Sequence, residues 1–96
     1  MFFVIAKHSD QISLKDWNMI IETTPYLERM PDRAGVNPFT KEPILFSAEG
    51  KAYVLVEGRR VGNISLEKGR LLTTGVPKRI CAELALKLGA QVWNGD

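Results

Sequence analysis

A histidine, a serine and an aspartate stand side by side near the start of the chain, at His8, Ser9 and Asp10. These are the residue types of a hydrolase triad, in which a histidine base activates a serine hydroxyl and a carboxylate orients the base. A triad is normally assembled from separate parts of a chain, because adjacent residues cannot usually direct all three side chains toward one another. We therefore interpret these residues as a polar turn rather than a catalytic site.

Cys81 is the only thiol in the chain. A catalytic cysteine needs a neighbouring base and an accessible, electropositive setting. Cys81 falls instead on the apolar stripe of a predicted helix, so we expect an inert core residue. One cysteine cannot form an internal disulfide, and no cysteine–histidine cluster has the spacing of metal ligands, so a reducing cytoplasm is the expected compartment. The glycines match no nucleotide-binding motif, and we predict no catalytic residue, no metal and no cofactor.

Basic residues gather at predicted hairpin ends and at a helix start: Arg59, Arg60, Lys68, Arg70, Lys78 and Arg79. Together they could form a phosphate-binding face. No aromatic residues are interleaved with them, as a platform for single strands would require. Solvated hairpin ends explain the charges more simply, so a nucleic-acid-binding module that uses Arg59 and Arg60 is the alternative function.

The elements that position these residues form a single domain, residues 1–96. A content of 45% apolar and 25% charged residues is that of an ordinary soluble globular protein. The apolar start, residues 1–6, is too short for a signal peptide or a membrane span, so we expect a strand and no membrane partner. Residues 1–50 hold five Lys/Arg and seven Asp/Glu, whereas residues 51–96 hold eight and four, so the first half is mildly acidic and the second basic.

Short apolar segments separated by turn signals predict an antiparallel meander over residues 44–74, with strands at 44–47, 51–56, 61–66 and 70–74. The apolar run from Phe2 to Ala6 predicts a further strand, central in the sheet and covered on both faces. Residues 90–93 predict a last strand, followed by a frayed tail at 94–96. The expected fold class is α+β, an antiparallel sheet built on the meander and extended by the first and last strands, with two principal helices packed on it.

Helix signals occur on both sides of the meander. Ser13 with Asp16 three residues later predicts a helix over residues 14–23, and a second helix is predicted with Pro77 in its first turn and Gly89 just past its end. Pro25 favours a short additional helix over residues 25–30. Residues 31–43 have no period and three prolines, which indicates a packed loop that is either functional or a simple crossover. Trp17 and Trp93 are expected to anchor the core.

Three stretches together resemble a known group: SLKDWNMIIETTPYL at residues 13–27, NPFTKEP at residues 37–43 and LALKLGAQVWNGD at residues 84–96. They are similar to small bacterial proteins that are often encoded beside polymorphic toxins of secretion systems. The resemblance implies a non-enzymatic immunity protein that binds and neutralises a cognate toxin. The chain departs from the group at Trp93 and Asn94, and its basic character argues against mimicry of a nucleic acid.

The expected contact surface is centred on Met19, which lies outside the apolar stripe of its helix. Protein interfaces are enriched in methionine, aromatic residues and arginine. The predicted partner-binding residues are Asp16, Met19, Glu22, Asp32, Arg33, Asn37, Phe39, Arg59 and Arg60. The acidic first half would suit a basic toxin, and the hairpin tip with two arginines is the alternative surface. A monomer or weak homodimer is expected, and a small enzyme is a third hypothesis.

Overall fold

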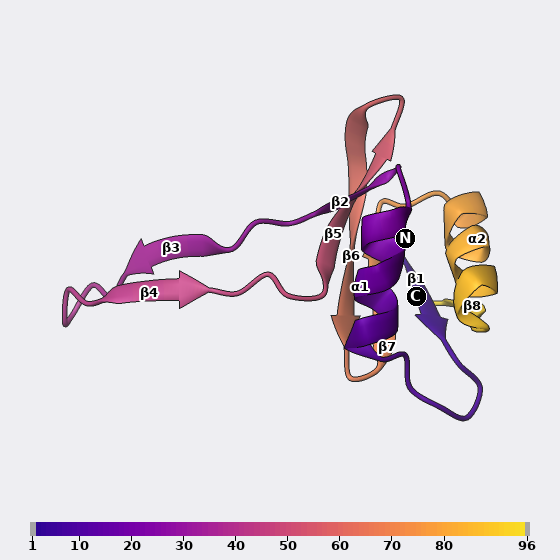
Figure 1. Cartoon of the computed structure of the whole chain (residues 1–96), viewed down its shortest axis with the longest axis horizontal. Helices are drawn as coiled ribbons and strands as arrows, with labels where there is room; N and C mark the ends of the chain where they lie inside the picture. The colour runs from indigo at the N-terminus through magenta and orange to yellow at the C-terminus, as the bar shows by residue number, and fades with distance from the viewer. Residues whose placement is uncertain (1, 96) are drawn as a thin grey trace.

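The computed structural model describes residues 2–95, and Met1 and Asp96 lie outside the described residues. In chain order the elements are β1 (Phe3–Ala6), α1 (Leu14–Thr23), β2 (Leu27–Arg29), β3 (Arg33–Val36), β4 (Pro43–Phe46), β5 (Lys51–Val56), β6 (Arg59–Glu67), β7 (Arg70–Thr74), α2 (Lys78–Leu88) and β8 (Gln91–Asn94). Six strands form an antiparallel sheet in the order β2-β5-β6-β7-β1-β8, and β3 pairs with β4 in a separate two-stranded sheet (Figure 1). The predicted α+β fold class is confirmed.

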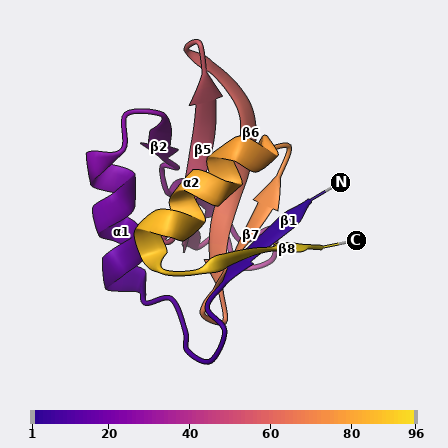
Figure 2. The ribbon, with the colours of Figure 1, turned by 90° about the vertical axis from the view of Figure 1, so that its right-hand side faces the viewer.

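The core lies between one face of the six-stranded sheet and the two helices (Figure 2). Its largest fully buried side chain is that of Trp17, whose indole Nε1 donates a hydrogen bond of 2.9 Å to the carbonyl oxygen of Gly50. The other buried apolar residues come from both helices, from the strands and from two connecting segments: Ile21, Ile80, Cys81, Leu84, Ala85 and Leu88, with Ile5, Leu27, Ala52, Val54, Ile64 and Leu71, and Ile12 and Val76. The opposite face of the sheet carries no helix, and we call it the helix-free face.

The predicted bounds of α1 and the predicted end of α2 are confirmed, whereas α2 begins at Lys78, so Pro77 is its N-cap and does not lie in its first turn. The Ser13 hydroxyl accepts a hydrogen bond of 3.1 Å from the backbone N–H of Asp16 and so caps the first turn of α1. Gly89 ends α2 in the left-handed conformation, with φ of 64°. Met19 is exposed on α1, as its helical phase predicts.

The predicted short helix over residues 25–30 is wrong. Residues 27–29 form β2 instead, which pairs antiparallel with β5 and places Leu27 opposite Val54. Only three residues separate the end of α1 from β2, and burying Leu27 against the core outweighs the weak helical preference of the segment. β2 is a strand because it pairs with β5, which is distant in the sequence. No signal within residues 25–30 predicts this pairing.

The predictions for residues 31–47 are right for one strand but wrong for the loop and for the pairing of that strand. Residues 31–43 are not a packed loop, because residues 33–36 form β3 and leave Val36 exposed. The predicted strand at 44–47 exists as β4, but it pairs with β3 and not with the meander. The meander therefore consists of β5, β6 and β7 alone.

Three further expectations, for β1, Trp93 and the tail, are wrong. β1 lies inside the sheet between β7 and β8, but only one of its faces is covered, since Ile5 is buried and Val4 is half-buried. Trp93 does not anchor the core: it is exposed on β8, opposite Val4 on the helix-free face. The tail is not frayed at residues 94 and 95, because Asn94 pairs with Phe3 in the sheet and Gly95 donates a backbone hydrogen bond to Phe2.

Cys81 should react with a thiol reagent far more slowly in the folded chain than free cysteine does. Its side chain is fully buried, and this burial raises the pKa of the thiol, so little thiolate forms at neutral pH. The measurement is the rate of reaction with a chromogenic disulfide reagent, with the urea-unfolded chain as the control. Equal rates for the folded and unfolded chain would contradict the burial of this residue.

Candidate functional site: a projecting hairpin arm

Residues 33–46, which we call the arm, form a hairpin that extends away from the rest of the chain (Figure 1). Figure 1 shows α2 on the opposite side of the main sheet from the arm. The arm is held at its root by two hydrogen bonds: the Asp32 carboxylate accepts from the backbone N–H of Ala48 at 2.7 Å, and the Met30 N–H donates to the Lys51 carbonyl at 3.1 Å. These bonds close the base of the hairpin where it leaves β2 and enters β5.

The tip of the arm is a closed turn organised by Asn37. Its side-chain oxygen accepts hydrogen bonds from the backbone N–H groups of Phe39 at 2.9 Å and Thr40 at 3.3 Å. The Asn37 N–H donates to the Glu42 carbonyl at 2.9 Å, and the Lys41 N–H donates to the Asn37 carbonyl at 2.8 Å. The turn leaves the Phe39 side chain 93% exposed. A fixed backbone therefore presents a large apolar side chain to solvent at the end of the arm.

One face of the arm is entirely apolar. In the register of the hairpin, Ala34 lies opposite Leu45 and Val36 opposite Pro43, and all four residues are exposed. The side chains of Val36 and Leu45 are 62% and 70% exposed. We call these four residues the apolar face of the arm. Contiguous exposed apolar surface on a projecting element is typical of an interaction site, because single exposed residues are common but clusters are not.

The other face of the arm carries Arg33, Gly35, Ile44 and Phe46. The Phe46 ring lies over Gly35, where an added Cβ would come within 2.9 Å of the ring carbon Cε2. A side chain at position 35 would therefore displace the ring. This contact fixes the orientation of Phe46, which still exposes about half of its surface.

The predicted contact residues on α1 lie away from the tip of the arm. Met19 is 56% exposed, as expected, but Glu22 forms an ion pair of 3.3 Å with Arg29 and is not a free carboxylate. Asp16 lies in the first turn of the same helix. Asp32 comes close to α1, since it lines a shallow cavity together with Asn18. Asn37 and Phe39 lie at the far end of the arm (Figure 1), so the structure does not bring all these residues onto one surface.

Arg59 and Arg60 lie at the turn between β5 and β6, which is shorter than predicted because both arginines begin β6. Arg60 is bonded to Glu28 at 2.8 Å, and its guanidinium stacks on the Tyr53 ring at 4.2 Å from the ring centre. Its charge is thus partly compensated. This hairpin tip is separate from the arm (Figure 1).

Sequence reasoning placed Asn37 and Phe39 in a candidate loop but missed Val36 and Leu45. The signal that marks them is a pair of short apolar runs on either side of an asparagine-containing turn, which is the pattern of a hairpin. Because residues 44–47 were predicted to belong to the main sheet, the hairpin pattern of residues 33–46 was not recognised.

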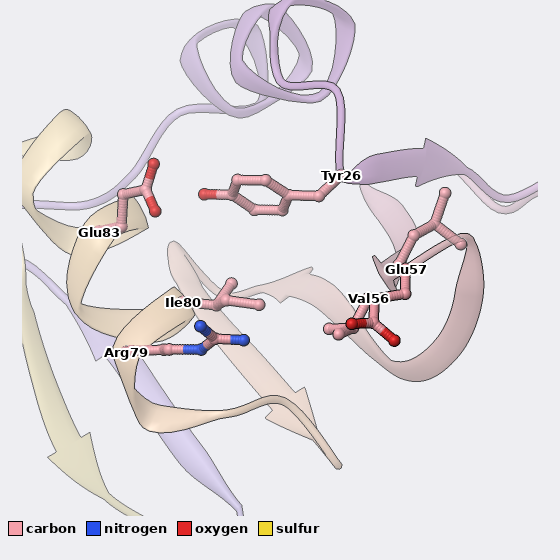
Figure 3. Close-up of a pocket in the computed structure, with 7 residues that line it drawn as sticks. Tyr26, Val56, Glu57, Arg79, Ile80 and Glu83 are labelled. Atoms are coloured by element: carbon pink, nitrogen blue, oxygen red, sulfur yellow. The ribbon is translucent and has the colours of Figure 1, made fainter.

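A second concave site lies between β5 and the start of α2, with a volume of about 420 Å³ (Figure 3). The Tyr26 hydroxyl is buried there and has no hydrogen-bond partner among residues 2–95, and Figure 3 shows it directed toward the Glu83 carboxylate. Burial, with a smaller contribution from the Glu83 charge, raises the pKa of Tyr26 from 10.0 to about 12. None of the residues around this cavity is a serine, cysteine or histidine, so it offers no nucleophile and base of a hydrolase.

Folding stability should fall between about pH 10 and pH 12 in a way that depends on Tyr26. The folded state favours the neutral phenol of Tyr26. The contribution of this group to folding stability is therefore complete below its unfolded pKa of 10.0 and is lost as the pH rises through about 12, its folded pKa. The Tyr26→Phe variant should lose less stability over this interval than the original chain, as measured by urea unfolding at each pH.

Within residues 2–95, no group of three histidine, cysteine, aspartate or glutamate side chains is arranged to hold a metal ion. None of the described helices is long and apolar enough to cross a membrane.

The chain was compared with known protein families, with characterised proteins and with solved structures, and nothing matches it in any of the three. The resemblance to toxin-associated immunity proteins therefore stays a prediction.

Proposed function

We propose that this chain is a non-enzymatic immunity-type protein that binds and neutralises a cognate bacterial toxin, with the arm as its main contact. The observation that carries the proposal is the apolar face of the arm together with the exposed Phe39 at its tip. The toxin as partner comes from the resemblance of residues 13–27, 37–43 and 84–96 to immunity proteins. The proposal places the protein in the cytoplasm, as a monomer or weak homodimer.

The arm has the surface that a tight protein interface needs. Burying one side chain the size of Val36, Leu45 or Phe39 contributes about 1.5–3 kcal/mol. Association costs at least about 4 kcal/mol in lost translational and rotational freedom, so several such side chains must be buried together. The tip turn holds Phe39 in place through the hydrogen bonds of Asn37, which reduces the ordering cost of binding.

The shape of the arm suits inhibition by occlusion. A two-stranded hairpin is narrow enough to enter an enzyme cleft, and Phe39 is the residue that would enter first. The unpaired edges of β3 and β4 also offer backbone groups for pairing with an extended segment of a partner. Neutralisation by this route needs no chemistry from the arm, because blocking the toxin's active site is sufficient.

The test is co-expression of the chain with the toxin encoded by the neighbouring gene. The original chain should restore growth and co-purify with the toxin, whereas Val36→Asp with Leu45→Asp should do neither. Arg59→Glu is the control at the other hairpin tip and should protect as well as the original chain. Circular dichroism of each variant checks that the main sheet is folded.

Either of two results would overturn the proposal. One is protection by the Val36→Asp, Leu45→Asp variant at the original level. The other is catalytic turnover by the purified chain that disappears on mutating His8 or Cys81. The alternative, a nucleic-acid-binding module based on Arg59 and Arg60, is less well supported because Arg60 is already paired with Glu28.

A further inference from the structure

A cleft of about 340 Å³ lies in the corner between the root of the arm and the helix-free face of the sheet. Arg33 and Phe46 line it from the arm, Lys51 and Tyr53 from β5, and Asn63 from β6. Lys51 and Tyr53 point away from the core, because Ala52 between them is fully buried on the helix side. Tyr53 lies opposite Asn63 in the register of the sheet, so both belong to the same face.

Two cations in this cleft are uncompensated. Neither Arg33 nor Lys51 has a carboxylate within ion-pair distance in the part of the chain that the structure describes, where the ion pairs are Arg29 with Glu22 and Arg60 with Glu28. The two positive charges come from different elements, the arm and the main sheet, yet both border the same cleft. Like charges placed together repel each other, so an anionic group between them would be stabilised by both.

Each aromatic wall of the cleft contacts a neighbouring residue that orients its ring. Tyr53 is held by Arg60, which lies 4.2 Å from its ring centre and is itself bonded to Glu28 at 2.8 Å. Phe46 is held against Gly35. The cleft therefore combines two unpaired cations with two oriented rings, which suits an anionic group carried on an apolar stem.

We propose that this cleft receives an acidic side chain of the protein partner, whose carboxylate lies between Arg33 and Lys51 while its methylene groups contact Phe46 and Tyr53. This inference rests on the proposed function and names the chemistry of the partner: an acidic segment, not the basic surface expected from the sequence. Arginine and lysine in a partly enclosed site bind carboxylates more strongly than they do on an open surface.

A protein is favoured over a nucleic acid as the source of the anion. The cleft is continuous with the arm, because Arg33 and Phe46 belong to the same two strands as Ala34 and Leu45. The apolar face of the arm needs apolar side chains to cover it, and a phosphate backbone offers none. Nucleic-acid interfaces are also much more positively charged than this surface, where the described residues provide two unpaired cations at the cleft.

The test is a titration of the ¹⁵N-labelled chain, followed by the shifts of its backbone amide signals. The probes are a short blocked peptide of alternating glutamate and leucine, a peptide in which lysine replaces glutamate, and an oligothymidylate of similar charge. The glutamate peptide should give saturable shifts at Arg33, Lys51 and Asn63 that weaken with added salt. Arg33→Glu with Lys51→Glu should weaken its binding at least about tenfold, the size expected when close charge pairs are reversed.

The control variant is Lys78→Glu with Arg79→Glu, which makes the same change of charge at the start of α2 and should bind the glutamate peptide normally. Arg33→Gln with Lys51→Gln repeats the test with neutral side chains, in case the charge reversal disturbs the arm. No saturable shift with the glutamate peptide up to about 10 mM, equal binding by the charge-reversed variant, or tighter binding of oligothymidylate at the same residues would each overturn the inference. A chain that binds the glutamate peptide at the cleft but no toxin would support the cleft and refute the toxin assignment.

Discussion

Trp17→Ala is expected to lower the free energy of unfolding by about 3–5 kcal/mol, the usual cost of truncating a large buried aromatic residue. The Trp17 side chain is fully buried between α1 and the sheet, so its removal leaves a cavity. The substitution also deletes the indole donor of the Gly50 carbonyl, an oxygen that would then be buried without this partner. Small domains are stable by about 5–15 kcal/mol in total, so a large part of the stability would be lost. Urea unfolding followed by circular dichroism measures the effect.

Trp93→Ala is the matched control for Trp17. Trp93 is 45% exposed on β8, and its indole N–H makes only a long hydrogen bond of 3.4 Å to the Ala6 carbonyl. The expected loss is therefore below about 1.5 kcal/mol, because part of the ring already faces water. Similar losses for the two variants would contradict the assignment of Trp17 to the core and Trp93 to the surface.

Phe39→Asp should weaken toxin binding at least about thirtyfold, which corresponds to a hot-spot contribution of about 2 kcal/mol, while it changes the free energy of unfolding by less than about 0.5 kcal/mol. The side chain is almost completely exposed and contributes little to the fold, so its charge acts on the bound state alone. Calorimetric titration with a catalytically inactive toxin measures the affinity, and urea unfolding measures the stability.

Two further variants test whether the toxin contacts the surfaces predicted from the sequence instead of the arm. Met19→Lys with Glu22→Lys changes the exposed side of α1, and Arg59→Glu changes the β5–β6 hairpin tip while it leaves Arg60 on the Tyr53 ring. Both variants should bind the toxin within about threefold of the original affinity. If either variant abolishes binding while Phe39→Asp binds normally, the contact surface is on that element and the arm is not the main contact.

Local signals were sufficient to predict the helices and most of the meander. The cap at Ser13 and the left-handed Gly89 act within one helical turn, so both can be recognised in a short window of sequence. β2 could not be found in this way, because its strand character comes from pairing with β5, more than twenty residues further along the chain. Trp93 was misplaced because a short strand exposes alternate residues, and only the position of the helices decides which alternate set is buried.

The candidate site was predicted in part. Asn37 and Phe39 were recognised as members of an unusual loop, and the structure places both at the tip of the arm. The prolines around them were interpreted as evidence for an irregular path. Pro43 is nevertheless the first residue of β4, a position where the missing backbone N–H is tolerated. The cleft at the root of the arm could not be predicted, since Arg33 and Lys51 line the same cleft only because β2 pairs with β5.

The way the arm joins the sheet has a consequence for evolution. Because β2 and β5 are direct neighbours, residues 30 and 51 are already joined by a backbone hydrogen bond before the arm begins. The arm, residues 33–46, can be lengthened, shortened or exchanged without altering the register of the six-stranded sheet, because it pairs only with itself. Mutations that change partner choice in the arm are thereby separated from mutations that would unfold the domain. Such a chain can diversify its recognition element rapidly, as an antibody does with its hypervariable loops, while selection on the remaining sequence maintains a single scaffold.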